Sequence, residues 1–368
     1  AKWYLPANIE LDANNTFDGN GQNLEEAAHL PEFIDLISAR TEFYTEPTAL
    51  PTVVNSSIKL DLHRRDFTIN TLALRLDGVH FGELFDYWGG LNDLRIGLVR
   101  VLHSLSFIDD PTRMLRAVRY EKRYHFEIES RTLGLLTEAL PLLARVSGDR
   151  LLAEFEHIFE EPEAIATLFR LEALGLMKAI HPHLDFDPQA AQRLSLMPET
   201  IPASTFYIKS ASAKDQRRVM AFTAWLLPLE EKIAETILSR LNYPNGEARI
   251  ILAALKLNRS ASAIMSLSLV ELVETLDEYD PFVIFLTTLF TSDEVCRSQM
   301  EKYLTGLRTV RPITTGDDLK RRGIPPSPLY RKILGALRNA WLEGRVTNAS
   351  QELDLLDELL REVQGDCE

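Results

Sequence analysis

Hydrophobic and polar positions follow different periods in the two parts of this chain. Within the first hundred residues, short runs rich in aromatic and β-branched residues are separated by turn formers, which predicts strands at residues 1–5, 33–39 and 81–87. From about residue 110 onward, apolar residues recur every three to four positions, as they do on one face of a helix. The pattern therefore predicts an α+β chain, with a partial antiparallel sheet first and an elongated all-helical region after it.

Two polar segments interrupt the first part. Residues 6–31 are rich in Asn, Asp and Gly, which predicts an exposed insertion between strands. Residues 41–57 contain two prolines and many hydroxyl side chains, which predicts a long mobile loop.

The segment LHRRDFTINTL (62–72) places two arginines and an aspartate directly before an apolar run. Asp66 is suited to cap a helix that continues through Asn70 and the leucines beyond it. Arg64 and Arg65 would then lie beside the N-terminus of that helix, where the helix dipole favours anions rather than cations. We therefore expect a negatively charged ligand to bind here.

Composition narrows the function classes. The 368 residues, 45% of them hydrophobic, suffice for two or more packed domains. Because the net charge is −14, any polyanionic partner must be bound by local basic patches. Cys296 and Cys367 lie far apart and outside any CxxC pair, so no structural zinc or disulfide framework is predicted. No apolar run is long enough to span a membrane and no signal peptide is visible, which predicts a cytoplasmic protein without a membrane partner.

The segment IDDPTRMLRAVRY (108–120) combines the groups best suited to nucleotide chemistry. Asp109 or Asp110 can cap a helix that begins at a proline, and arginines then recur at three-residue intervals: Arg113, Arg116 and Arg119. One interpretation is a solvated helix face behind an ordinary N-cap. In the other, an aspartate acceptor beside an arginine donor matches the edge of a nucleobase, and the later arginines bind phosphates.

Two further segments are explained most simply by structure. DYWGGLNDL contains Gly89 and Gly90, which permit a sharp turn, and Asp93, which can cap the helix that follows. Further along, Arg150 and Glu154 have the i, i+4 spacing of an ion pair on a helix surface.

Basic residues gather near the C-terminal end, in TGDDLKRRGIPPSPLYRKIL. A short capped helix there ends in a triplet that is either solvated or in contact with an RNA backbone: Lys320, Arg321 and Arg322.

Metal-binding carboxylates are scarce in the first hundred residues. A nucleotidyl-transferring site needs clustered carboxylates to bind Mg²⁺, and only Asp35, on a predicted strand, is well placed for this. No DxD pair lies on a predicted strand, and the sequence contains no P-loop.

Taken together, these stretches resemble the class II tRNA nucleotidyltransferase/poly(A) polymerase family, whose motifs occur in the same order. RRDFTIN resembles the motif that contacts the sugar and phosphates of the nucleotide, DYWGGLNDL the hinge, and DDPTRMLRAVR the helix that selects the base. RLLAEF resembles the motif after that helix, ARTEFYTEPTALPTV the flexible loop, and TGDDLKRRGIPPSPLY the tail of bacterial members. The resemblance covers residues 28–175 well and the tail loosely.

This resemblance implies template-independent addition of C or A to the 3′ end of tRNA, with ATP or CTP as substrate and two Mg²⁺ ions. The nucleotide would be bound by seven residues: Arg65, Asp66, Asn70, Asp110, Arg113, Arg116 and Arg119. Of these, Asp110 and Arg113 would select the base, and the last two would bind phosphate or hold the helix. The site would be supported by Asp93, Arg150 and Glu154. Asp35 would be the catalytic carboxylate and metal ligand, and the RNA-binding residues would be Lys320, Arg321 and Arg322.

The chain departs from the family pattern in three respects. Asp109 stands where Glu is usual, Tyr87 and Trp88 replace the usual proline of the hinge, and both the GGxxRD segment and the DxD metal site are absent. We therefore expect a catalytic head that lacks its N-terminal part and an incomplete sheet. The chain alone should show negligible nucleotidyl transfer, and the lacking segment would be supplied in cis or in trans.

The predicted domains are four: a partial head (1–104), a neck that recognises the base (105–175), a body (176–270) and a tail that binds tRNA (271–368). Two other functions fit the same motifs, namely a poly(A) polymerase acting on other RNA and a non-catalytic RNA-binding module. The sequence leaves open whether the product is C, CC, A, CCA or a poly(A) run.

Overall fold

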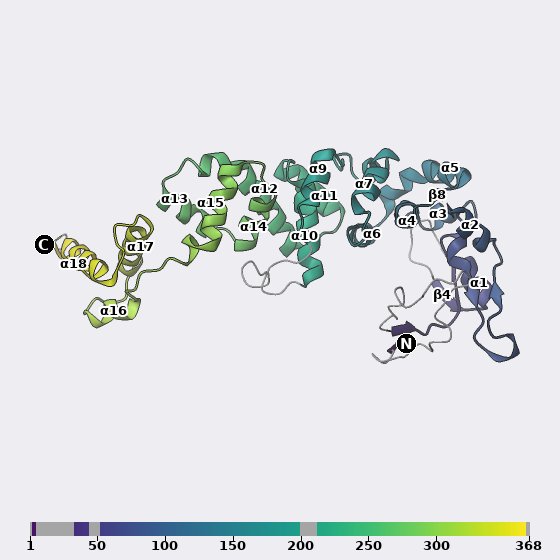
Figure 1. Cartoon of the computed structure of the whole chain (residues 1–368), viewed down its shortest axis with the longest axis horizontal. Coiled ribbons are helices and arrows are strands. Elements are labelled where there is room, and N and C mark those ends of the chain that lie inside the picture. Colours follow the sequence, from purple (N-terminus) through teal and green to yellow (C-terminus); the bar gives the residue numbers. More distant parts are fainter. Residues whose placement is uncertain (1, 5–32, 44–51, 199–211, 366–368) are drawn as a thin grey trace, which may run out of the picture. The chain divides into compact units, whose positions relative to one another are not determined.

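The computed structural model describes the chain in four stretches, coloured in Figure 1: residues 2–4, 33–43, 52–198 and 212–365. The chain forms two compact units. The first unit comprises residues 1–113 and 126–135, and the second comprises residues 114–125 and 136–368. Every described strand belongs to the first unit and the second is helical, which confirms the α+β class.

The strands of the first unit are short and pair two by two. Three pairs are antiparallel, as predicted: β1 (Lys2–Tyr4) with β2 (Phe33–Asp35), β3 (Arg40–Phe43) with β4 (Thr52–Asn55), and β5 (Ala73–Leu74) with β6 (Leu84–Phe85). The fourth pair is parallel: β7 (Leu98–Val99) with β8 (Glu127–Ile128). Residues 127–128 were expected to be helical, so the all-helical neck is corrected at this point.

The predicted loop at residues 41–57 is wrong at both of its ends. These ends form a hairpin in which Arg40 pairs with Asn55 and Phe43 with Thr52. β-Branched Thr41, Val53 and Val54 suit extended backbone, which explains the pairing. The centre of this loop and the predicted insertion at residues 6–31 lie outside the described residues.

The helix expected after Asp66 is also wrong. An α-helix, α1 (Ile58–His63), precedes the arginine pair, and only a 3₁₀ turn, η3 (Thr68–Thr71), follows it. Phe67 is fully buried and bridges to Val101, so a sheet-like contact takes this segment out of helical geometry. Arg64 is the C-cap of α1, where the helix dipole favours a cation, and the two arginines therefore need no anion to explain them.

The hinge segment is shaped by its two glycines. Gly89 has a left-handed backbone with φ +74°, and a Cβ added to Gly90 would lie 2.3 Å from the carbonyl oxygen of Thr68. The helix that follows, α2 (Gly90–Ile96), is capped by Asp86, whose carboxylate accepts the backbone N–H groups of Gly90 and Leu91 at 2.7 and 3.1 Å. Asp93 is therefore not the cap that the sequence suggested.

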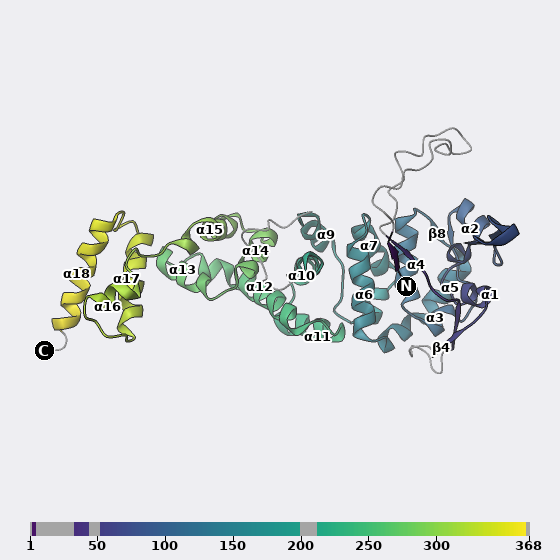
Figure 2. The same ribbon diagram turned by 90° about the horizontal axis from the view of Figure 1, so that it is seen from below.

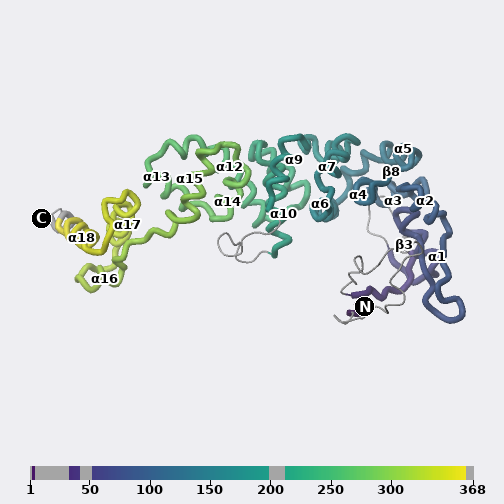
Figure 3. Tube along the Cα trace, in the orientation of Figure 1, coloured from purple at the N-terminus to yellow at the C-terminus, as the bar shows by residue number. Residues whose placement is uncertain are grey.

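The remaining described secondary-structure elements of both units are helices. The helices between residues 78 and 180 that have not yet been given are η4 (Gly78–His80), α3 (Ser106–Asp109), α4 (Arg113–Arg123), α5 (Ser130–Ala139), η5 (Leu140–Arg145), α6 (Gly148–Phe159), α7 (Ala164–Ala173) and α8 (Leu176–Ile180). Those that follow, traced in Figures 2 and 3, are α9 (Pro188–Ser195), α10 (Ala213–Leu226), α11 (Glu231–Arg240), α12 (Asn245–Ile264), α13 (Leu269–Asp277), α14 (Pro281–Phe290), α15 (Glu294–Thr305), η6 (Leu307–Thr309), α16 (Gly316–Arg321), α17 (Leu329–Leu342) and α18 (Ala349–Gly365).

Apolar helix faces form the cores of the second unit. Phe155 and Phe222 are fully buried and meet edge to face with ring centroids 6.2 Å apart. The last three helices pack around a small apolar cluster of their own: Leu319, Ile333, Leu337 and Leu356. In the part of the chain that the structure describes, no helix combines the length and apolarity needed to cross a membrane.

Candidate functional site

The arginine pair that follows α1 is organised by one buried carboxylate. Asp61 accepts from Arg64 Nη2 at 2.9 Å, from Arg65 Nη2 at 3.4 Å and from the backbone N–H of Arg40 at 3.1 Å. Burial raises the pKa of Asp61, but these donors outweigh it and leave that pKa below its ordinary value. The side chain of Arg65 stays 43% exposed and is therefore accessible to a ligand.

Asp66 has a local structural role. Its buried Oδ1 accepts the backbone N–H of Phe67 at 3.0 Å and the side-chain amide of Asn70 at 2.7 Å. The carboxylate thus fixes the turn between α1 and η3 and orients Asn70, although it does not cap an α-helix.

Arg113 connects the start of α4 to this turn. Its guanidinium is buried, and it donates to Ser106 Oγ and to the carbonyl oxygen of Arg64, both at 2.8 Å. Asp110 Oδ1 accepts both the backbone N–H and the hydroxyl of Thr112, at 3.0 and 2.6 Å, so the capping interpretation of Asp110 is confirmed. The structure therefore brings the predicted phosphate-binding and base-selecting residues together in the first unit.

The next two arginines of α4 do not form a solvated face. In the second unit, Arg116 donates to Glu154 at 2.9 Å, and Arg119 lies 3.6 Å from Glu154 and 3.2 Å from Glu161. Glu154 and Arg119 are both buried, so the carboxylate of Glu154 lies in the interior of the unit and not on a solvated helix surface. The pairing of Arg150 with Glu154 stays a prediction. Glu154 instead anchors α4 to α6.

Asp93 supports the hinge from the buried side. Its carboxylate is buried and accepts hydrogen bonds from the hydroxyl of Thr68 at 2.7 Å and from Nε of Arg100 at 2.9 Å. Sequence reasoning missed Arg100, and it also missed Asp61, Asp86, Ser106 and Glu161. Only Asp86, which lies three residues before Gly89 of the diglycine turn, had a local signal, because a carboxylate there is suited to cap the following helix.

Asp35 is exposed on β2, opposite Lys2 of β1. Within the described residues, no three His, Cys, Asp or Glu side chains are grouped so that they could hold a metal ion. Asp35 by itself does not make a magnesium site.

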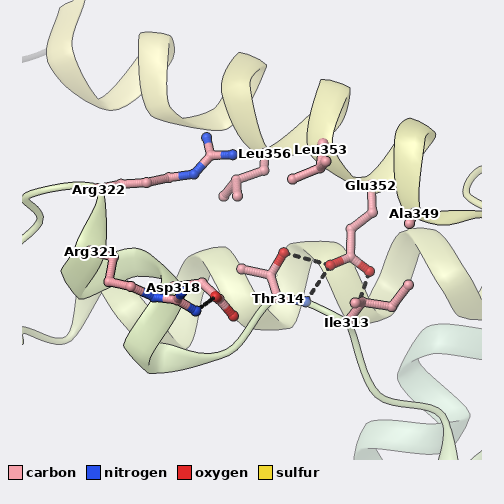
Figure 4. Close-up of a pocket in the computed structure, with 9 residues that line it drawn as sticks. All are labelled: Ile313, Thr314, Asp318, Arg321, Arg322, Ala349, Glu352, Leu353 and Leu356. Carbon is pink, nitrogen blue, oxygen red and sulfur yellow. Dashed lines mark hydrogen bonds and ion pairs between the residues drawn. The ribbon is translucent and has the colours of Figure 1, made fainter.

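The basic triplet lies at the C-terminal end of α16, beside a pocket of about 350 Å³. Figure 4 shows Arg321 and Arg322 on one side of this pocket and Glu352, from α18, on the other. Arg321 pairs with Asp318 and Arg322 with Asp357, whereas Lys320 is exposed. Part of the positive charge is therefore already compensated within the protein.

Comparison with known proteins decides the family. Residues 13–100 match the poly(A) polymerase head domain, and residues 125–187 match a family described as "Probable RNA and SrmB- binding site of polymerase A". The A-adding tRNA nucleotidyltransferase of Halalkalibacterium halodurans is 31% identical over 340 residues, which cover 90% of this chain and 75% of that protein. The chain belongs to the tRNA nucleotidyltransferase/poly(A) polymerase family.

Two other members of this family show the extent of the similarity. The A-adding tRNA nucleotidyltransferase of Geobacter sulfurreducens is 35% identical over 87% of this chain, but the chain spans only 37% of that protein's length. The solved structure of the Thermotoga maritima CCA-adding enzyme complexed with tRNA aligns with 85% of this chain and 77% of its own, at 27% identity and a TM-score of 0.65. The resemblance drawn from the motifs is thus confirmed at the level of the family and the fold.

Proposed function

We propose that this nucleotidyltransferase family member acts in the transfer of a nucleotide from ATP or CTP to the 3′ end of tRNA, without a nucleic-acid template. The bond between Arg113 and the carbonyl oxygen of Arg64, 2.8 Å long, carries the proposal. Arg65 is the next residue in the chain, so a phosphate-binding arginine and a base-selecting arginine are joined through one peptide unit. Through this link, Arg65 would bind the phosphates of a nucleotide while Arg113 selects its base.

Hydrogen-bonding chemistry supports the choice of nucleotide. The carboxylate of Asp110 accepts from an exocyclic amine, which adenine and cytosine both carry, and Arg113 donates to their ring acceptors. Guanine and uracil present a carbonyl where that amine would be, so an acceptor would face an acceptor. Structurally similar CCA-adding enzymes have been solved with ATP and with CTP, and both curated relatives named above are A-adding, which favours ATP.

The remaining residues divide between nucleotide binding and support. We assign Arg65 to the triphosphate because its side chain is accessible, and Asn70 to the sugar because Asp66 fixes its orientation. We assign Arg116 and Arg119 to holding α4, since Glu154 and Glu161 already compensate their charges. Asp93 would hold the hinge, and Arg150 would support α6.

Magnesium stays a prediction from the family resemblance. The described residues offer Asp35 as an isolated carboxylate and do not fit a two-metal site, so we derive no step through a metal ion. The tRNA partner is proposed on the same family basis, with the basic triplet, whose three residues are all exposed, as its contact. A cytoplasmic location likewise stays a prediction.

Equilibrium binding of the four nucleoside triphosphates to the 368-residue chain, with EDTA present, tests the nucleotide assignment. The wild type should bind ATP about 5- to 160-fold more tightly than GTP or UTP, because leaving a polar group unpaired costs about 1–3 kcal/mol. Asp110→Asn should reduce this ratio to within about threefold, since an amide both accepts and donates.

A matched variant separates base selection from phosphate binding. Arg65→Ala should weaken all four nucleotides by one common factor and leave their ratio unchanged. Because Asn caps a helix as well as Asp does, Asp110→Asn with the wild-type ratio would show that Asp110 is a structural cap only.

A further inference from the structure

Five aromatic rings form a continuous row in the first unit. In order they are Phe85, Tyr87, Trp88, His63 and His103, and neighbouring ring centroids lie 5.4–5.8 Å apart. The two outer pairs are nearly parallel, with interplanar angles of 16° and 19°. Tyr87 and Trp88 occupy the hinge position at which this chain departs from the family pattern, so the departure supplies two of the rings.

This row differs from an ordinary aromatic core in its exposure. Tyr87 is 44% exposed, His63 is also exposed, and the other three rings are half-buried. In the second unit, by contrast, the edge-to-face pair Phe155 and Phe222 is fully buried. A row of rings that stays in contact with water has surface left for a planar ligand to cover.

The charged neighbours of the row indicate which ligand fits. Beside the second ring of the row, the ammonium of Lys59 lies 5.4 Å from the centroid of Tyr87. At the last ring of the row, His103 Nε2 lies 4.0 Å from Asp109 Oδ2, beside the base-selecting Asp110. Burial lowers the pKa of His103, although Asp109 opposes the shift. Cations together with successive aromatic rings are the features that bind single-stranded nucleic acid.

We propose that this row is a stacking site for the unpaired 3′-terminal bases of the RNA substrate. The proposal rests on the proposed function, because it requires an RNA whose 3′ end approaches Asp110. Every nucleobase has a π face, so the row would hold the strand without reading its sequence. Lys59 would contact a phosphate, and base selection would remain with Asp110 and Arg113.

Binding of two tRNAs to the 368-residue chain tests this site. One tRNA ends in its two unpaired cytidines, and the other is the same molecule trimmed of them. The wild type should bind the untrimmed tRNA more tightly, by about 5- to 160-fold for each stacked base. Trp88→Leu and Tyr87→Leu should each reduce this difference at least about fivefold without changing the affinity for trimmed tRNA. Trp88→Phe, which keeps a ring, should retain most of it.

Phe81→Leu is the matched control, because Phe81 is a 73% exposed ring of the same unit outside the row, and its loss should leave both affinities unchanged. Thermal unfolding of each variant identifies any that fails to fold, and Tyr87→Leu, at the more exposed position, then decides the matter. Leucine variants that keep the wild-type difference, or that weaken both tRNAs equally, would overturn the stacking site. A wild type that binds both tRNAs alike would also overturn it, whereas one that binds neither would refute the proposed function itself.

Discussion

Removing the carboxylate of Glu154 should loosen α4, the helix that begins at the candidate base-recognition residue Arg113. Glu154 lies on α6 and is 6% exposed. It accepts a hydrogen bond from Arg116 at 2.9 Å, and its other oxygen lies 3.6 Å from Arg119 without a hydrogen-bond partner. In Glu154→Ala the guanidiniums of Arg116 and Arg119 both lose this partner, and a cavity replaces the Glu154 side chain.

The cost follows from what each arginine retains. Breaking a buried ion pair by removing one partner costs about 3–5 kcal/mol. Here the side chain of Arg116 is 29% exposed and regains water, while Arg119 keeps Glu161 at 3.2 Å. We therefore expect Glu154→Ala to lower the free energy of unfolding by about 2–3 kcal/mol. Glu154→Gln keeps an acceptor for Arg116 and should cost about 1–2 kcal/mol.

Hydrogen exchange measured by mass spectrometry, combined with urea unfolding, checks both values. Peptides that cover α4 should exchange about 30-fold faster in Glu154→Ala than in the wild type, as a 2 kcal/mol loss implies. Glu235→Gln, at an exposed position on α11, is the control and should change stability by less than about 0.5 kcal/mol. The effect should persist in 1 M NaCl, because salt screens buried pairs weakly. Exchange in α4 equal to that of the control would refute the anchoring role of Glu154.

Three other perturbations test separate parts of the structure. Glu352→Gln should destabilise the last three helices by about 3 kcal/mol in urea unfolding, because the buried carboxylate of Glu352 accepts four hydrogen bonds and an amide would lose two of them. Glu358 is exposed, so Glu358→Gln is the control and should leave the stability of these helices unchanged. Burial raises the pKa of Glu352 but its donors lower it overall, so this stabilisation should be present above the ordinary pKa of 4.5 and lost as the pH falls through the lowered pKa, in the wild type and not in Glu352→Gln. Gly90→Ala should cost at least about 2 kcal/mol because its Cβ would meet the carbonyl oxygen of Thr68, while Gly134→Ala, in open space on α5, should not destabilise. The last perturbation replaces the basic triplet, Lys320, Arg321 and Arg322, by alanine. The slope of log K for tRNA binding against log salt concentration should become shallower by about 0.7–0.9 for each lost phosphate contact. An unchanged slope would identify the triplet as a solvated helix end.

Local chemistry is what the sequence predicted well. Apolar spacing predicted the helices after residue 110, and the diglycine predicted a turn that Gly89 and Gly90 do form. Asp110 caps α4 through Thr112, as its position before a proline suggested. Each of these features depends on residues within a few positions of one another, so a single sequence is sufficient to see them.

Features that depend on distant residues were predicted wrongly or not at all. The segment after Asp66 has helix-like spacing, but the burial of Phe67 against Val101 outweighs that weak local preference. The spacing of Arg150 and Glu154 suggested a surface position for Glu154, yet Glu154 is buried and contacts arginines 38 and 35 positions earlier in the chain. Neither outcome can be read from spacing, because competition between local and distant partners is settled by packing.

The first three arginines of α4, Arg113, Arg116 and Arg119, illustrate this limit and show its consequence for function. They recur at identical intervals and look equivalent in the sequence, but their partners differ. Arg113 donates to two uncharged oxygens, those of Ser106 and the Arg64 backbone. Within the part of the chain that the structure describes, no carboxylate compensates its positive charge, which we therefore expect to be available to a nucleotide. Arg116 and Arg119 face carboxylates that already balance their charge. Base selection should therefore be separable from helix anchoring, with substitutions at Arg113 changing nucleotide preference and substitutions at Arg119 changing stability.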